Sequence, residues 1–379
     1  MTEQELIDFY MLTSIQGIGR KTLYRLLDMY KTPGNVLSIS DKDAKNIFSS
    51  KIYENFKYTK SHWDKDKEYK KMLDMGIRII PYNHEDFPKK LKVIPDPPSC
   101  IFVKGQLPSE NKPSVSIVGA RMCSEYGRYN AREFALGLSE ANIQIISGMA
   151  LGVDGISQKA ALSAGYPSYA VLGCSPEICY PKDNRQVYDM LCKNGGIISE
   201  YPPGTNPVAR LFPMRNRIIS GLSDIVLVIE ARKKSGTLIT VDMALEQGKE
   251  IFAVPGRITD RLSDGCNDLI RQGAGIALSP EDIISCLETI TETSDYSMNN
   301  VSSEFTQTKS PFNCNKNLSP LEKSILEVMD IYPLSAIQIT GLLEKKSVSE
   351  PVSVILQTLT MMQINGLIEN RGSYYVKII

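Results

Sequence analysis

Two arginines lie beside an apolar segment in the stretch FPMRNRIISG, residues 212–221. Arg215 and Arg217 are followed within a few residues by DIVLVIEA, 224–231, a run that is typical of a buried strand. Arginine is rarely placed against a protein core unless a carboxylate or an anionic ligand pairs with it. The stretch therefore indicates an anion, held either as a ligand or as part of a structural ion-pair network.

Basic residues and glycines also follow the other strand-like runs, where ligands of a doubly wound sheet bind. Nine basic residues fall in these segments: Arg121, Lys182, Arg185, Arg210, Arg215, Arg217, Arg232, Lys233 and Lys234. Glycine amides and helix N-termini attract phosphate. We predict DNA or phosphate binding by Gly119, Arg121, Ser147, Gly148, Gly152, Lys182, Arg215, Asn216, Arg217, Ser235, Gly236 and Thr237. The alternative for some of the arginines is an ion-pair network with Asp154 and Glu230.

The elements that would position these residues alternate between apolar strand-like runs and helical patterns from residue 114 to about 287. Such alternation predicts a parallel sheet with helices on both faces. Residues 76 to 110 add two shorter strand-like runs, IRII and CIFVKG. We therefore expect an α/β, Rossmann-like, doubly wound and mostly parallel sheet over residues 76–287.

The segments on either side differ from this core. Residues 1–75 have helical periodicity, and the turn at 15–19 resembles a helix-hairpin-helix (SAM-like) unit. The alternative is a plain αα-hairpin whose glycines only permit a tight turn. Residues 288–317 are rich in Ser, Thr and Asn and predict a flexible linker. Residues 318–379 predict a winged helix of three helices and a hairpin. Its near-neutral charge favours a protein-contact or accessory role over duplex binding.

Composition excludes several classes of protein. Lys+Arg and Asp+Glu are equal at 43 each, so any basic site must come from local arrangement. Cysteines show no metal-binding spacing, and we expect reduced thiols, no metal and a cytoplasmic location. There is no basic, apolar leader and no long apolar run, so we expect no signal peptide and no membrane span. GxGxxG and Walker A motifs are absent and only His62 and His84 are present, so we expect no cofactor and no enzyme activity.

Long segments of the chain resemble the bacterial DprA/Smf family of DNA-processing proteins of natural transformation. The resemblance rests on VSIVGAR, IISGMALGVDGISQKAAL, FPMRNRIISGLSDIVLVIEARKKSGTLIT and ALEQGKEIFAVPG, and it spans roughly residues 77 to 287. It implies a Rossmann-like core that binds single-stranded DNA, forms a homodimer through its α/β domains and helps to load RecA recombinase. It also implies roles in DNA binding for Arg121, Lys182, Arg215 and Arg217. Leu151 stands where many members carry arginine, which removes one expected phosphate contact.

Two further points stay open in the sequence. Tyr126, Tyr180 and Phe212 are candidates for stacking on bases, yet each also fits an apolar core. The segment KKSGTLIT resembles the PGGxGTxxE motif of nucleoside-monophosphate phosphoribohydrolases, which is the alternative function. Thr240 stands at the place of that motif's catalytic glutamate, so such an enzyme would need another carboxylate, for example Glu246.

Overall fold

The structure is a computed structural model. It describes residues 1–295, 318–329, 334–346, 348, 350–364, 367–371 and 374–377, with the backbone alone for 291–295, 370, 371 and 376. The chain divides into two compact units, Met1–Thr293 and Ser294–Ile379. No described helix is long and apolar enough to cross a lipid bilayer.

The first unit begins with helices that pack against one end of a sheet. They are α1 (Glu3–Ser14), α2 (Arg20–Tyr30), α3 (Pro33–Leu37), α4 (Asp41–Ile47), α5 (Ser50–His62) and α6 (Lys65–Asp74). Leu12, Leu23 and Met72 share one hydrophobic core with Ile77 and Phe102 of the first two strands. The last of these helices ends at Asp74, and their hydrophobic core continues into the sheet.

Nine strands form the sheet of the first unit, in the order β1-β2-β6-β5-β4-β3-β7-β8-β9. Their bounds are β1 (Ile77–Pro81), β2 (Cys100–Gly105), β3 (Ser114–Val118), β4 (Gln144–Ser147), β5 (Ser168–Leu172), β6 (Gly196–Ser199), β7 (Ile225–Val228), β8 (Glu250–Ala253) and β9 (Gly275–Ile276). β3 to β9 pair in parallel, whereas β1 and β2 add an antiparallel edge. The predicted α/β, mostly parallel sheet is confirmed.

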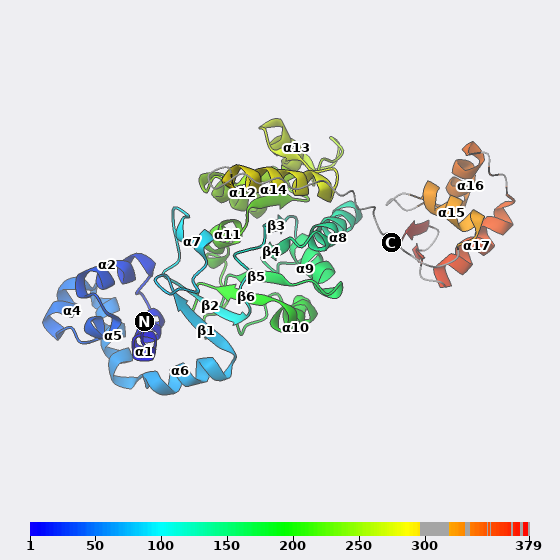
Figure 1. The fold of residues 1–379 in the computed structure, drawn as a ribbon. Coiled ribbons are helices and arrows are strands. Elements are labelled where there is room, and N and C mark those ends of the chain that lie inside the picture. The colour runs from blue at the N-terminus through cyan, green and yellow to red at the C-terminus, as the bar shows by residue number, and fades with distance from the viewer. Residues whose placement is uncertain are drawn as a thin grey trace. The chain divides into compact units, whose positions relative to one another are not determined.

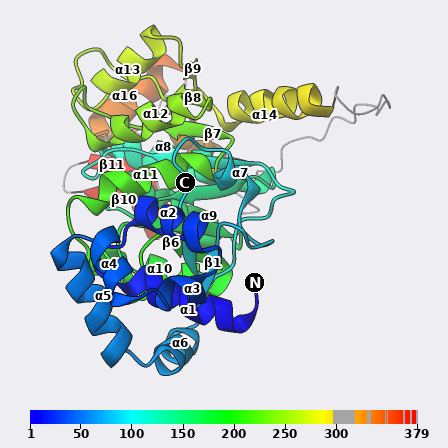
Figure 2. The same cartoon turned by 90° about the vertical axis from the view of Figure 1, so that its left-hand side faces the viewer.

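Helices cover both faces of this sheet (Figure 1). The helices after β1 are α7 (Lys89–Lys92), α8 (Glu125–Glu140), α9 (Val153–Ser163), α10 (Arg185–Asn194), α11 (Leu211–Gly221), α12 (Gly236–Glu246), α13 (Asp264–Arg271) and α14 (Pro280–Asp295), with a short 3-10 helix η1 (Lys182–Asn184). β3 shows why two layers form, since Val115 and Ile117 pack under α8, α9 and α14 while Val118 packs with α11 and α12. Figures 1 and 2 both place the N-terminal helices near β1, and Figure 2 shows α13 close to β8 and β9.

The chain reverses its direction across the sheet between β3 and β7. From β3 it builds β4, β5 and β6 on one side, and it then returns to place β7, β8 and β9 on the other side. The loops after β3 and β7 consequently diverge. A crevice at the carboxyl ends of these two strands is where ligands bind in doubly wound folds.

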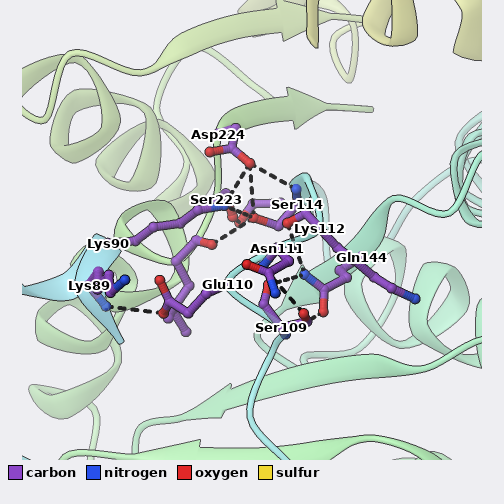
Figure 3. Close-up of polar contacts among 12 residues, drawn as sticks. Lys89, Lys90, Ser109, Glu110, Asn111, Lys112, Ser114, Gln144, Ser223 and Asp224 are labelled. Carbon is purple, nitrogen blue, oxygen red and sulfur yellow. Dashed lines mark hydrogen bonds and ion pairs between the residues drawn. The ribbon is translucent and has the colours of Figure 1, made fainter. Parts of the chain in front are cut away.

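A polar cluster lies at the amino ends of the strands, opposite to the carboxyl ends where the crevice opens (Figure 3). Lys90 Nζ donates to Asp224 Oδ2 at 2.7 Å and to Ser114 Oγ at 2.8 Å. Gln144 Oε1 accepts from the Ser109 amide at 2.7 Å, and Gln144 Nε2 donates back to the Ser109 carbonyl at 2.9 Å. These bonds fasten α7 and the connection before β3 to the amino ends of the strands.

Four elements were not predicted from the sequence, and one boundary was wrong. The unpredicted elements are the short helices α7 and η1, the two-residue strand β9, and α14. Because α14 runs to Asp295, the predicted start of the linker at residue 288 is wrong. The remainder of the predicted linker, 296–317, lies outside the described residues.

The second unit contains α15 (Pro320–Val328), α16 (Ala336–Lys345), α17 (Val352–Ile364), β10 (Ile368–Arg371) and β11 (Tyr374–Lys377). β10 and β11 form an antiparallel pair, and Leu334 bridges to Tyr375 of β11. This element order is the one expected of a winged helix.

Candidate nucleic-acid interface

A pocket of about 460 Å³ opens at the carboxyl ends of β3 and β7. The loop after β3, the loop after β4, the start of α11 and the start of α12 contribute its walls. The lining residues that matter here are Gly119, Ala120, Arg121, Asp154, Phe212, Arg215, Asn216, Arg232, Ser235, Gly236, Thr237 and Thr240. The predicted site residues Gly119, Arg121, Arg215, Asn216 and 235–237 are thereby brought together from three separate segments.

Two exposed arginines line the pocket from opposite loops. Arg121 follows β3 and Arg232 follows β7, and both are exposed. Neither forms an ion pair within the described part of the chain. Their charges are available to a bound anion, which favours a phosphate between the two loops.

The N-terminus of α12 enters the same pocket. Ser235 is the N-cap residue but accepts no hydrogen bond from the helix, and its buried Oγ has no partner among the described protein atoms. The first amides of a helix have no partner within the helix, and the helix dipole adds positive potential there. A Cβ on Gly236 would meet no atom within 4 Å, so the space beside this helix start is open.

Arg215 supplies a buried positive charge in the pocket wall. Its side chain is only 6% exposed, and its Nη1 donates to the carbonyls of Gly148, at 2.9 Å, and of Val171. Burial lowers the pKa of Arg215 to about 10, and Asp154 opposes that shift. A guanidinium with a pKa of about 10 remains charged at neutral pH, so Arg215 contributes a fixed cation.

Asp154 is the partial counter-charge of Arg215. Its Oδ2 accepts from the amides of Gly148, at 3.1 Å, and Ala150, at 3.4 Å. Burial raises the pKa of the Asp154 carboxyl, and the Arg215 guanidinium lowers it. A Cβ on Gly148 would lie 2.6 Å from Arg215 Nη2 and 2.8 Å from Asp154 Oδ2, so the glycine lets these two groups approach the end of β4.

Gly152 and Gly119 hold the loops after β3 and β4 together. Gly152 has φ +75°, and a Cβ there would meet the Ala120 carbonyl oxygen at 2.2 Å. A Cβ on Gly119 would meet Val153 Cγ2 at 2.7 Å. These two glycines position Arg121, and Gly119 also lines the pocket. Ser147, also predicted to bind phosphate, instead donates to the Ile117 carbonyl at 2.6 Å inside the sheet.

The structure does not bring Arg217 to the pocket. Its side chain is 4% exposed, its Nε donates to the Asp96 carbonyl at 2.9 Å, and its Nη2 lies 2.7 Å from Glu200 Oε1. Arg20 of α2 joins the same network through Asp96, at 2.5 Å. Residues two apart on a helix point about 200° apart, so Arg215 and Arg217 cannot both face one pocket.

Lys182 and Glu230 lie outside the arrangement that the sequence suggested. Lys182 is exposed on η1 and does not line the pocket, although Asn184 anchors this loop by donating to the Met149 and Ala150 carbonyls at 2.9 Å. Glu230 accepts from the amide and hydroxyl of Ser124 at the start of α8. It orients that helix, and no arginine pairs with it among the described residues.

Arg232 was counted among the basic residues but was not included in the predicted binding set. Arg232 directly follows β7, next to the point where the chain reverses its direction across the sheet, and this position is the signal that would have selected it.

Comparison with known proteins identifies the family. The model of the family described as DNA recombination-mediator protein A matches residues 78–288. The chain belongs to this DprA/Smf family. The DNA processing protein DprA of Streptococcus pneumoniae is 41% identical over 222 residues, which are 59% of this chain and 77% of that protein. Protein Smf of Escherichia coli is 41% identical over 211 residues, 55% of this chain and 56% of that protein.

Solved structures of the family share the fold. DprA from Streptococcus pneumoniae aligns with a TM-score of 0.64 and 33% identity, covering 74% of this chain and 96% of that one. DprA from Helicobacter pylori, whose structure concerns a single-stranded DNA binding mode, aligns with a TM-score of 0.51 and 30% identity over 56% of this chain and 96% of that one.

Proposed function

We propose that this protein binds single-stranded DNA in the pocket between β3 and β7. Backbone phosphates lie against Arg121, Arg232 and the N-terminus of α12, and Arg215 supplies a fixed charge beneath them. The observation that carries the proposal is the meeting of two exposed arginines without ion pairs and an uncapped helix N-terminus in one pocket. Contacts to backbone phosphates do not distinguish one base from another, so we expect binding that tolerates any sequence and weakens with salt.

A role in DNA processing accords with the family, in which the Helicobacter pylori protein binds single-stranded DNA. We propose that the protein acts in the cytoplasm, protects single strands in transformation or recombination, and transfers them to RecA recombinase. A direct test follows RecA's DNA-dependent ATP hydrolysis on oligonucleotides coated with single-strand-binding protein. Wild type should shorten the lag before ATP hydrolysis begins. An unchanged lag would contradict the proposed loading of RecA.

The charges of the pocket favour binding over nucleotide hydrolysis. Among the lining residues Asp154 is the one carboxylate, and it is held by two amides beside Arg215. Thr240 lines the pocket where the hydrolase motif has its glutamate, and Glu246 is exposed and outside the lining. No carboxylate in the lining is therefore placed to act as a general acid or base.

Fluorescence anisotropy with labelled oligonucleotides tests the proposal against this rival. We expect tighter binding to a single strand than to a duplex of the same length, and no release of free base from nucleoside monophosphates. Base release without binding of single strands would support the hydrolase instead.

We also propose a homodimer through the α/β core, as the family resemblance implies, near residues 269–276. Ile276 of the edge strand β9 is 50% exposed and Leu278 is 74% exposed, which gives this edge an apolar surface. Light scattering should report a dimer for wild type and a monomer for Ile276→Asp. Equal masses for the two proteins would contradict this surface.

A further inference from the structure

We propose that Tyr180 and Phe212 form a stacking platform for one unpaired base at the rim of the pocket. The inference rests on the proposed function, since it assigns a base subsite to the same single strand.

The two rings are stacked on each other. Their centroids lie 5.4 Å apart and their planes are inclined by 23°. Phe212 is half-buried and lines the pocket beside Arg215 and Asn216. An aromatic ring that is already stacked on a fixed neighbour presents a flat, oriented face at little conformational cost.

Gly173, directly after β5, provides the seat for Phe212. A Cβ on Gly173 would lie 2.7 Å from Phe212 Cδ1. The Phe212 ring is therefore fixed against the carboxyl end of the sheet, and it in turn supports Tyr180.

Tyr180 is the outer ring of the pair. It is 44% exposed, so much of its surface is open to a ligand, and Lys182 follows two residues later on the exposed helix η1. A base on Tyr180 would place its phosphate within the reach of a cation. Tyr126, the third aromatic candidate, is half-buried and its hydroxyl donates to the Pro255 carbonyl at 2.7 Å, which makes it a structural residue.

Such a platform would select single strands over duplex. Every base has a π-face that can stack on tyrosine, so the contact tolerates any sequence. In a duplex these faces are already stacked on neighbouring base pairs. The arginines alone would bind phosphates of either form.

The test compares wild type with Tyr180→Leu, and Tyr180→Phe serves as the conservative variant. The matched control is Tyr58→Leu, because Tyr58 is also exposed (65%) and stacked, on His62, but lies on α5 and outside the pocket lining. Affinities are measured across a salt series for an ordinary oligonucleotide and for one whose central positions are abasic. A 2-aminopurine oligonucleotide reports stacking through quenching of its fluorescence.

We expect Tyr180→Leu to weaken binding of the ordinary strand by roughly 5- to 150-fold, the range for loss of one base–aromatic stack. The salt slope should not change, because no phosphate contact is lost, and Tyr180→Phe and Tyr58→Leu should bind like wild type. The abasic strand should bind wild type and Tyr180→Leu equally, and the quenching should disappear in Tyr180→Leu.

If wild type binds the strand and Tyr180→Leu matches it in affinity and quenching, the platform is refuted while the phosphate site stands. If wild type binds no single strand, the proposed function itself fails, and the platform fails with it.

Discussion

Arg215 and Arg217 belong to one short motif but have different roles because of helix geometry. Arg215 lies in the pocket wall with Asp154 close by, whereas Arg217 pairs with Asp96 and Glu200 next to Arg20 of α2. Arg217 therefore belongs to an ion-pair network, whereas Arg215 stays a predicted ligand-binding residue.

Replacing Arg217 should harm stability rather than DNA binding. In Arg217→Gln the largely buried Glu200 loses its closest cation, and breaking such a pair costs about 3 kcal/mol. Denaturant unfolding measures the loss, and anisotropy on the folded protein should give wild-type affinity for single strands. Arg128→Gln is the control, since Arg128 is 54% exposed and its pair with Glu125 should contribute under about 1 kcal/mol. If Arg217→Gln were as stable as wild type but bound DNA more weakly, Arg217 would be a DNA-binding residue and this prediction would be wrong.

At the scale of elements, most of the α/β core was predictable because each buried strand is a short apolar run between helical patterns. The partners of the strands were not predictable from local pattern. β1 and β2 join antiparallel beside β6, and β9 is too short to carry a periodic signal. The sequence predicted which loops form the pocket. It did not predict which of their side chains face the pocket, because that depends on the helix phase and on close contacts at glycines.

The contact between the loops after β3 and β4 is the element-scale feature on which Arg121 depends. Gly152→Ala would place a Cβ 2.2 Å from the Ala120 carbonyl oxygen at a φ of +75°, so the loop that carries Arg121 must move. We expect weaker binding of single strands, by about tenfold if one charged contact worth about 1.4 kcal/mol is lost, and a lower melting temperature. Gly341→Ala is the control, because a Cβ there meets no atom within 4 Å. Equal affinity and melting temperature in Gly152→Ala would contradict this role.

The junction between the helices and the sheet should weaken in alkali. Tyr10 of α1 packs against Phe102 of β2, and burial raises the pKa of Tyr10 from 10.0 to about 12. Its contribution to stability is complete below pH 10 and is lost as the pH rises towards 12. Urea unfolding between these pH values should show wild type losing up to about 1.4 kcal/mol per pH unit more than Tyr10→Phe. Parallel pH profiles for the two proteins would contradict the account.

For the whole molecule, we propose that single strands bind to the first unit. α17, the third helix of the second unit, has no charged residue in its sequence VSVILQTLTMMQI, so it offers no cation to a DNA phosphate. We propose that the second unit is a winged helix that serves protein contact. A chain ending at Asp295 should keep the affinity of the full chain for a single strand within about twofold, which is under about 0.5 kcal/mol. A tenfold loss, or duplex binding that disappears with residues 296–379, would place DNA contacts in the second unit.

The salt dependence of single-strand binding tests the central claim most directly. Arg121→Gln/Arg232→Gln is compared with wild type and with Arg132→Gln, an exposed arginine of α8 outside the pocket lining. Each phosphate contact with single-stranded DNA contributes about 0.7 to the slope of log affinity against log salt, so the double variant should bind more weakly and lose about 1.4 from the slope. Arg132→Gln should keep the wild-type slope. A double variant with unchanged affinity and slope would show that the pocket arginines do not hold DNA phosphate.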